Sequence, residues 1–147
     1  MNRKHFTATG IILRNNKILT IWHDKLQVWL PPGGHIEKNE TPEEALIREC
    51  LEEIDSEIII INNANYKIET PKVQVLNNPY CTLLEPITDK SGTHYHIDFF
   101  YLCKLKNNNL QFNNKNNLRW ICFEDLDSLN TFDNVKKLFR TILKSRY

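Results

Sequence analysis

The sequence has no run of 18 apolar residues, no basic tract, no acidic tail and no Cys-x-x-Cys pair. A chain without a long apolar run is not expected to cross a bilayer as a helix. The N-terminal residues show no signal peptide, because no apolar segment there leads to a small-residue cleavage site. With no basic tract and a formal net charge of +1, the chain is not expected to bind a nucleic-acid backbone. We therefore expect a cytoplasmic protein with no membrane partner and no nucleic-acid partner.

The cysteines are also too dispersed for a disulfide framework. They lie far apart, at Cys50, Cys81, Cys103 and Cys122. Three of them sit in apolar segments, which favours reduced thiols that act as small buried hydrophobic residues. A zinc site or a disulfide framework is the less favoured alternative.

The length and composition are those of one soluble domain. The chain has 147 residues, of which 41% are hydrophobic and 25% are charged. A chain of this length can bury a core without disulfides or metal ions. Since neither a repeat nor a linker interrupts the sequence, we expect a single domain over residues 1–147.

The first part of the chain predicts a β-hairpin. The β-rich segments FTATGIIL and ILTIWH are joined through Asn15 and Asn16, and asparagine tolerates the positive φ that a tight hairpin turn requires. Residues 28–30 (VWL) predict a short strand. The PPGGH segment that follows predicts a break in regular structure.

A helix is expected to begin after Thr41 and to end near Ile54. Thr41, Pro42 and Glu44 have the spacing of a capping box, with threonine as N-cap and glutamate three residues later. Proline at the first helical position supports the same start.

The rest of the chain predicts strands at 57–61, 94–105 and 118–123. Prolines at positions 71, 79 and 86 break residues 62–89 into short strands and loops, and residues 107–117 predict a polar loop. A terminal helix follows from the helical spacing of Val135, Leu138, Phe139, Ile142 and Leu143. A mixed sheet with two helices places the chain in the α/β class.

Three glutamates cluster on the helix expected at residues 42–54. Helical spacing places Ile47, Cys50, Leu51 and Ile54 on one apolar stripe, and Glu49, Glu52 and Glu53 on roughly the opposite side. Like charges at this spacing destabilise a helix by about 0.2–0.5 kcal/mol per pair. A solvated surface is one explanation. The other is a bound hard cation such as Mg²⁺, which prefers oxygen ligands. Gly33 and Gly34 just before the helix support this explanation, because glycine lets the backbone approach an ion or a phosphate.

The spacing of these residues resembles the Nudix box, G-x5-E-x7-R-E-U-x-E-E-x-G-U, where U is a bulky aliphatic residue. All six glycine and charged positions up to the last glutamate match, at Gly34, Glu40, Arg48, Glu49, Glu52 and Glu53. Three positions depart from the pattern, since Cys50 and Ser56 replace aliphatic residues and Asp55 replaces the second glycine. Aspartate is one of the few residues besides glycine that tolerates a left-handed conformation, so we expect an altered turn with the metal ligands intact.

The resemblance implies a fold, an activity and a set of site residues. The fold would be a Nudix-type α/β/α sandwich with a mixed β-sheet and two main helices. The activity would be Mg²⁺- or Mn²⁺-dependent hydrolysis of a diphosphate linkage in a nucleotide or a nucleoside diphosphate derivative. The implied metal ligands are Glu49, Glu52, Glu53 and the Gly33 carbonyl, and one of the glutamates would also orient or deprotonate the attacking water. Arg48 and Glu40 would support these ligands, with Arg48 paired to a glutamate.

Further candidates lie outside this cluster. The strand expected at 94–105 has a face that is polar at its start, where His94, His96 and Asp98 alternate with core residues. Asp98 could supply a further metal carboxylate or a substrate contact, and His94 or His96 a substrate contact. Glu85 is a rival for an additional carboxylate or base, and Gly34 and His35 could contact a phosphate. A zinc site built from His94, His96 and a distant cysteine is a less favoured alternative.

Several functional alternatives stay open at this stage. The substrate could be a nucleoside triphosphate or oxidised nucleotide, or it could be ADP-ribose or a nucleotide sugar. A non-catalytic nucleotide sensor of the same fold is a second class, although a sensor does not need the whole glutamate cluster. A nucleic-acid enzyme such as a cap remover is disfavoured by the near-neutral charge. The resemblance also implies a homodimer as one option, because members of the family are often dimers.

Overall fold

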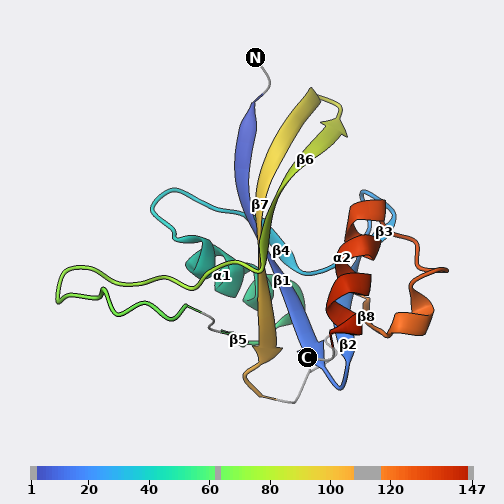
Figure 1. Ribbon diagram of the computed structural model, residues 1–147. Coiled ribbons are helices and arrows are strands. Elements are labelled where there is room, and N and C mark those ends of the chain that lie inside the picture. Colours follow the sequence, from blue (N-terminus) through green and yellow to red (C-terminus); the bar gives the residue numbers. More distant parts are fainter. Residues whose placement is uncertain (1–2, 62–63, 108–116, 146–147) are drawn as a thin grey trace.

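A central mixed sheet lies between two helices in the computed structural model, which describes residues 3–61, 64–107 and 117–145. Figure 1 shows helix α1 (Pro42–Ile54) on one side of the central strands and helix α2 (Asp133–Lys144) on the other. Two separate hydrophobic clusters fill the spaces between the sheet and the helices, one under α1 and one under α2. This arrangement confirms the predicted α/β/α sandwich with a mixed sheet and two main helices.

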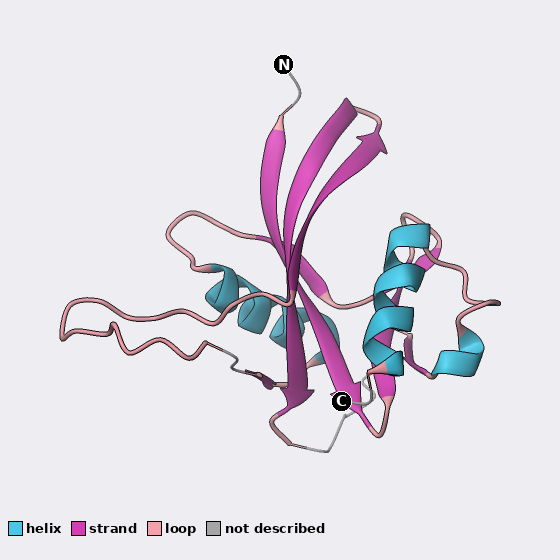
Figure 2. Cartoon of the chain, viewed as in Figure 1, coloured by secondary structure: helices cyan, strands magenta, loops and turns pink. Residues whose placement is uncertain are grey.

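Eight strands form the sheet among the described residues. They are β1 (Lys4–Arg14), β2 (Lys17–His23), β3 (Val28–Leu30), β4 (Gly33–His35), β5 (Ile58–Ile60), β6 (Cys81–Asp89), β7 (Gly92–Leu105) and β8 (Leu118–Ile121). A short 3₁₀ helix, η1 (Phe123–Asp125), follows β8. Figure 2 shows the strands crossing the centre of the molecule, with the helices outside them.

Strands β1 and β7 form the parallel centre of the sheet, in register from Lys4 opposite Tyr95 to Ile12 opposite Cys103. Strand β4 pairs with β1, and β6 and β5 pair with β7, all antiparallel. Strand β2 pairs with β1, β3 and β8. The long strand predicted at 94–105 is confirmed as part of β7.

The predicted hairpin is confirmed. Asn15 and Asn16 join β1 to β2 with φ values of 49° and 56°. Two consecutive positive φ values are those of a type I′ turn, whose twist matches that of the flanking strands.

Two strand predictions were wrong in part. The segment Gly33–His35 was expected to be irregular, but it forms β4, since β1 offers it backbone partners. Residues 81–89 were expected to be broken, but they form β6 in spite of Pro86. Among the described strands, β6 pairs with β7 alone, so it is an edge strand. An edge strand tolerates proline, although proline has no N–H to donate.

Both ends of α1 are as predicted. The Thr41 hydroxyl accepts a hydrogen bond from the Glu44 N–H, and the Glu44 carboxylate accepts one from the Thr41 N–H. At the other end Asp55 adopts the left-handed conformation, with φ 50° and ψ 39°. The residue that replaces the second glycine of the box therefore makes the turn that glycine would make.

The buried face of α1 differs from the predicted stripe. Ile47 and Leu51 are 39% and 44% exposed, whereas the fully or almost fully buried residues are Ala45, Leu46, Cys50 and Ile54. The helix is thus rotated so that the side of Glu49 and Glu53 lies next to the sheet, instead of opposite it. A hydrogen bond from the Gly33 N–H of β4 to Glu53 supports this orientation.

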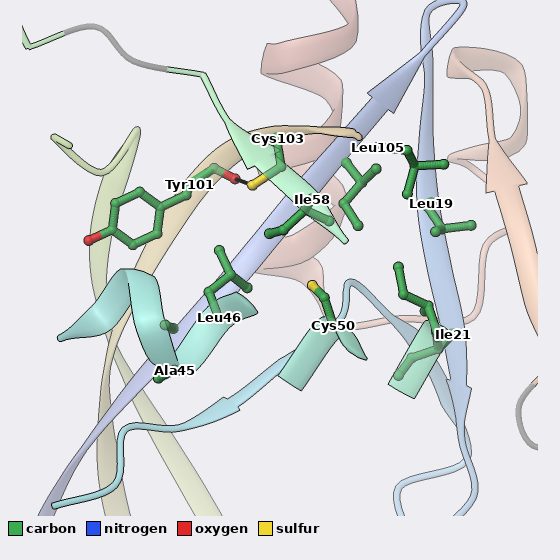
Figure 3. Close-up of a cluster of buried hydrophobic side chains, with 12 residues drawn as sticks. Leu19, Ile21, Ala45, Leu46, Cys50, Ile58, Tyr101, Cys103 and Leu105 are labelled. Atoms are coloured by element: carbon green, nitrogen blue, oxygen red, sulfur yellow. Dashed lines mark hydrogen bonds between the residues drawn. The ribbon is translucent and has the colours of Figure 1, made fainter. Parts of the chain in front are cut away.

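The cluster under α1 joins the helix to β1, β2, β5 and β7. Figure 3 shows Leu46 and Cys50 of α1 with Ile58, Tyr101 and Cys103 around them. All four cysteines are free thiols. Cys50 and Cys103 are buried, as predicted, whereas Cys122, the third cysteine in an apolar segment, is only partly buried. Burial raises the pKa of the Cys103 thiol above its usual range, so this residue packs as an uncharged apolar group.

The cluster under α2 confirms the terminal helix. Its buried residues in α2 are Val135, Phe139, Ile142 and Leu143, with Leu138 packed against them. Neither helix in the described part of the chain has the length and apolar character needed to span a membrane. Most of the predicted loop at 107–117 lies outside the described residues.

Removal of the α1 cap tests the local origin of this helix. We expect Thr41→Ala to lower the free energy of unfolding by about 1 kcal/mol, because the Glu44 N–H loses its acceptor. Thr41→Ser keeps the hydroxyl and is expected to stay within about 0.5 kcal/mol of the parent protein. Urea unfolding followed by circular dichroism measures both variants, and equal stability of Thr41→Ala and the parent would contradict the assigned cap.

Candidate active site

The three predicted metal-ligand glutamates lie on α1 beside strand β4. A Cβ atom at Gly34 would fall inside van der Waals contact of the Glu49 carboxylate, so the helix and β4 approach each other closely. At Gly33 a Cβ would meet the backbone of Ala8 in β1. The two glycines are therefore what allow the helix and the strand to come together.

Glu53 is held against β4. The Gly33 N–H donates a hydrogen bond of 3.2 Å to Glu53 Oε1. Burial and the nearby Glu49 and Glu52 charges raise the pKa of Glu53 above its usual range, in spite of this hydrogen bond. Burial, more than the neighbouring charges, thus disfavours the ionised form of this carboxylate. The predicted contact of the Gly33 carbonyl with a metal ion stays a prediction.

Arg48 is paired as predicted. Its Nε and Nη2 donate to the two carboxylate oxygens of Glu40, at 2.6 and 2.9 Å, and Nη1 donates to Glu49 Oε1 at 2.9 Å. The Nη2 group also donates to the His35 carbonyl at 3.0 Å. These hydrogen bonds hold the pKa of Glu40 at about 2, chiefly through Arg48. Arg48 thus fixes the position of Glu49 relative to β4.

The glutamates differ in exposure. The Glu49 side chain is 17% exposed, whereas Glu52, 3.5 Å from Arg48 Nη1, is 59% exposed. Glu49, Glu52 and Glu53 thus place both partly buried and exposed carboxylates on one surface of the helix. Among these residues Arg48 alone is positively charged, so the negative charge exceeds the positive charge.

This set of groups fits a divalent cation. All candidate ligand atoms are oxygens, which hard cations such as Mg²⁺ prefer. Burial and the neighbouring carboxylates disfavour the ionised form of Glu53, and a bound cation would stabilise that form. The residues present therefore match the divalent-metal dependence that is typical of the family they resemble.

A second carboxyl pair lies on the α2 side of the sheet. Asp98 is buried and accepts hydrogen bonds of 2.9 Å from the Thr9 hydroxyl at both oxygens. Burial raises the pKa of Asp98 to about 6, and burial with the neighbouring Asp98 raises the pKa of Glu85 to about 7. Asn134, at the start of α2, donates to Glu85 Oε1 at 2.9 Å. Asp98 has the same orientation in β7 as Phe100, which packs under α2. Asp98 and Glu85 therefore come together, apart from the glutamates of α1.

Three strands bring four histidine rings together. The rings of His35 and His96, both predicted substrate contacts, lie 4.9 Å apart. His5 lies beside both, with ring centroids 5.3 Å from His35 and 5.9 Å from His96. His94 is 5.1 Å from His96. No cysteine belongs to this group in the described residues, which disagrees with the alternative zinc site of two histidines and a cysteine.

The sequence did not point to Asn134, Thr9 or His5. Each is brought to its partner by pairing between distant segments: β1 sets His5 opposite His96, and the start of α2 sets Asn134 beside Glu85. The polar character of the β7 face was the available signal for a site here, but it did not identify the partners.

Comparisons with known proteins agree with the geometry. The NUDIX domain family matches residues 4–141. The chain is 34% identical over 111 residues to an 8-oxo-dGTP diphosphatase of Proteus vulgaris, which covers 71% of this chain and 81% of that protein.

Solved structures show the same fold. The crystal structure of a NUDIX-family hydrolase from Clostridium perfringens has a TM-score of 0.82 and 31% identity, with full coverage of both chains. The Ap4A hydrolase of C. elegans has a TM-score of 0.68 and 21% identity, also with full coverage of both, and shows likeness of fold alone. The match over residues 4–141, together with the Proteus and Clostridium relatives, establishes that this chain belongs to the NUDIX domain family and is a Nudix hydrolase.

Proposed function

We propose that this protein is a Mg²⁺-dependent pyrophosphohydrolase that cleaves a diphosphate linkage in a nucleoside triphosphate, with oxidised purine nucleotides as the preferred class. The relative from Proteus vulgaris, named for 8-oxo-dGTP, supports this substrate class. The proposal depends on one observation above all: Arg48 and Gly33 hold Glu49 and Glu53 together against β4.

Glu49, Glu52 and Glu53 are the proposed ligands of Mg²⁺, or of Mn²⁺ in its place, with the Gly33 carbonyl as a further ligand. When bound, the cation would neutralise charge on the diphosphate and favour deprotonation of water. Arg48 orients Glu49, and Glu40 orients Arg48 through two parallel hydrogen bonds. One of the three ligand glutamates also orients or deprotonates the attacking water.

Glu85, Asp98 and Asn134 are proposed to contact the nucleobase. With pKa values of about 7 and 6, Glu85 and Asp98 hold a proton over part of the neutral range and so offer both donors and acceptors. A site that hydrogen-bonds polar groups of a substrate strongly rejects analogues that lack them. Gly34 and His35 lie on β4 and His96 lies on β7, and all three are proposed to contact the rest of the nucleotide.

The identity of the products tests the function. The untagged protein is incubated with Mg²⁺ and 8-oxo-dGTP, dGTP, Ap4A, ADP-ribose or a nucleotide sugar, and the products are identified by mass. We expect 8-oxo-dGTP to give the nucleoside monophosphate and pyrophosphate, with activity lost on addition of a chelator. Faster release of a mononucleotide and a sugar phosphate from ADP-ribose or a nucleotide sugar would overturn the proposed substrate class. Binding of nucleotides with no turnover of any compound would favour the sensor.

Glu53→Gln tests the proposed metal ligands. We expect kcat/KM to fall by at least about 100-fold, because a neutral amide is a poor ligand for Mg²⁺. Glu57→Gln is the matched control, since Glu57 lies just beyond the helix and pairs with Lys106 at the surface. Circular dichroism confirms that both variants are folded. A folded Glu53→Gln protein with near-normal turnover would show that this residue is not a ligand.

The two glycines are expected to respond differently to an added methyl group. Gly34→Ala displaces the flexible Glu49 carboxylate, so we expect about a 10–100-fold loss of kcat/KM with less than about 1 kcal/mol of lost stability. Gly33→Ala meets backbone atoms of Ala8 and Thr9, which cannot move aside, so we expect about 1–3 kcal/mol of lost stability. Steady-state kinetics and urea unfolding separate these effects, and a reversed order would contradict the assigned contacts.

A further inference from the structure

Four of the five histidines of the chain gather at one end of the sheet, on its α2 side. His5 comes from β1, His35 from β4, and His94 and His96 from β7. The fifth, His23, lies at the end of β2, where its Nδ1 accepts a hydrogen bond from the Leu26 N–H. The proposed cleavage of a diphosphate does not require such a group of imidazoles.

The ring nitrogens face one another at separations suited to metal binding. Ligand atoms of His5, His94 and His96 all lie within 4.8 Å of one another. The Nε2 atoms of His94 and His96 are 3.2 Å apart. Two imidazole nitrogens at the usual bond length in a tetrahedral zinc site are about 3.3 Å apart, so this pair already has the required spacing.

His35 lies next to these three. Its Nε2 is 3.3 Å from His5 Nδ1, and its side chain is more exposed than the others. His35 is therefore placed to act as a fourth metal ligand, or to contact a water molecule that is bound to the metal. Its backbone carbonyl is fixed by Arg48, which holds this part of β4 in place.

The surroundings of His5 and His96 favour the neutral form of these two rings. Desolvation and the neighbouring histidines lower the pKa of His96 to about 4, and desolvation with His94 and His35 lowers the pKa of His5. Neutral imidazoles have a free lone pair for a cation at neutral pH. Hydrogen bonds between neutral rings explain two close contacts, but they do not explain why three rings converge.

His94 has the surroundings of an oriented metal ligand. It is buried, and its Nδ1 has no hydrogen-bond partner among the described residues. Asp89 Oδ2 is 4.0 Å from this atom. A carboxylate on the far ring nitrogen of a ligating histidine fixes the tautomer and increases the basicity of the ligand, and a shift of about 1 Å would make that hydrogen bond.

We propose that His5, His94 and His96 form a site for a borderline divalent transition-metal ion, with Zn²⁺ as the best match and His35 or water as the fourth ligand. Imidazole suits Zn²⁺, Cu²⁺ and Ni²⁺, whereas Mg²⁺ prefers carboxylate oxygens. The histidine site therefore differs in its chemistry from the glutamate cluster of α1. A bound ion would join the parallel strands β1 and β7 at the edge of the proposed nucleotide site.

Metal binding alone tests the site, on the full chain without a polyhistidine tag. Zn²⁺ is titrated by calorimetry in the presence of excess Mg²⁺, and Co²⁺ is added separately to record its visible spectrum. We expect one Zn²⁺ per chain and a Co²⁺ spectrum of tetrahedral type. His5→Gln and His96→Gln should each weaken Zn²⁺ binding by at least about 100-fold, because each removes a ligand.

Two controls separate this site from others. His23→Gln removes the histidine outside the group, and Glu53→Gln alters the glutamate cluster. Both should keep the Zn²⁺ affinity and the Co²⁺ spectrum. Loss of binding in either control, equal binding in all variants, or no binding by the parent protein would overturn the proposal. Since His5 is near the start of β1 and only partly buried, His5→Gln provides the test even if His96→Gln does not fold, and ¹⁵N imidazole spectra of the parent then identify which rings shift with Zn²⁺.

Discussion

The guanidinium of Arg48 is the interaction on which the glutamate site depends. It donates two hydrogen bonds to Glu40, one to Glu49 and one to the His35 carbonyl. It thus joins the loop before α1, the helix itself and strand β4. A lysine has no planar fork and could not hold these groups at once. Because one cation faces several carboxylates, Arg48 orders the glutamates without cancelling their charge, and the negative charge that remains is what a divalent cation requires.

Features specified by neighbouring residues could be predicted from the sequence. The capping box at Thr41, the left-handed Asp55 and the Asn15–Asn16 turn each depend on backbone preferences within a few positions, and each occurs in the structure. The box spacing also identified Arg48 and its pairing to glutamate. Each of these features forms between residues that are close in the sequence, so it depends little on the rest of the fold.

Features that depend on distant partners were less predictable. Helical spacing alone favoured a stripe through Ile47 and Leu51, but the sheet accepts the face of Leu46 and Cys50 instead. An apolar side chain at a helix position does not reveal whether a neighbouring surface exists to cover it. In the same way, Pro86 is compatible with β6 because β7 supplies hydrogen bonds along one side. The sequence of residues 81–89 alone does not reveal this partner strand.

Strand β4 lies where the two sides of the sheet used by the proposed function meet. Successive residues of a strand point to opposite faces. Gly34 faces α1, where a Cβ would displace Glu49, and His35 faces the α2 side, where its ring lies beside His96. A single step along β4 therefore leads from the side of the proposed phosphate-cleaving groups to the side that carries the groups proposed to contact the base. The strand is only three residues long, and α1 contacts one of its faces while the His35 ring projects from the other. This requires glycine at position 34 and allows a large side chain at position 35, which is the order in which the chain has them.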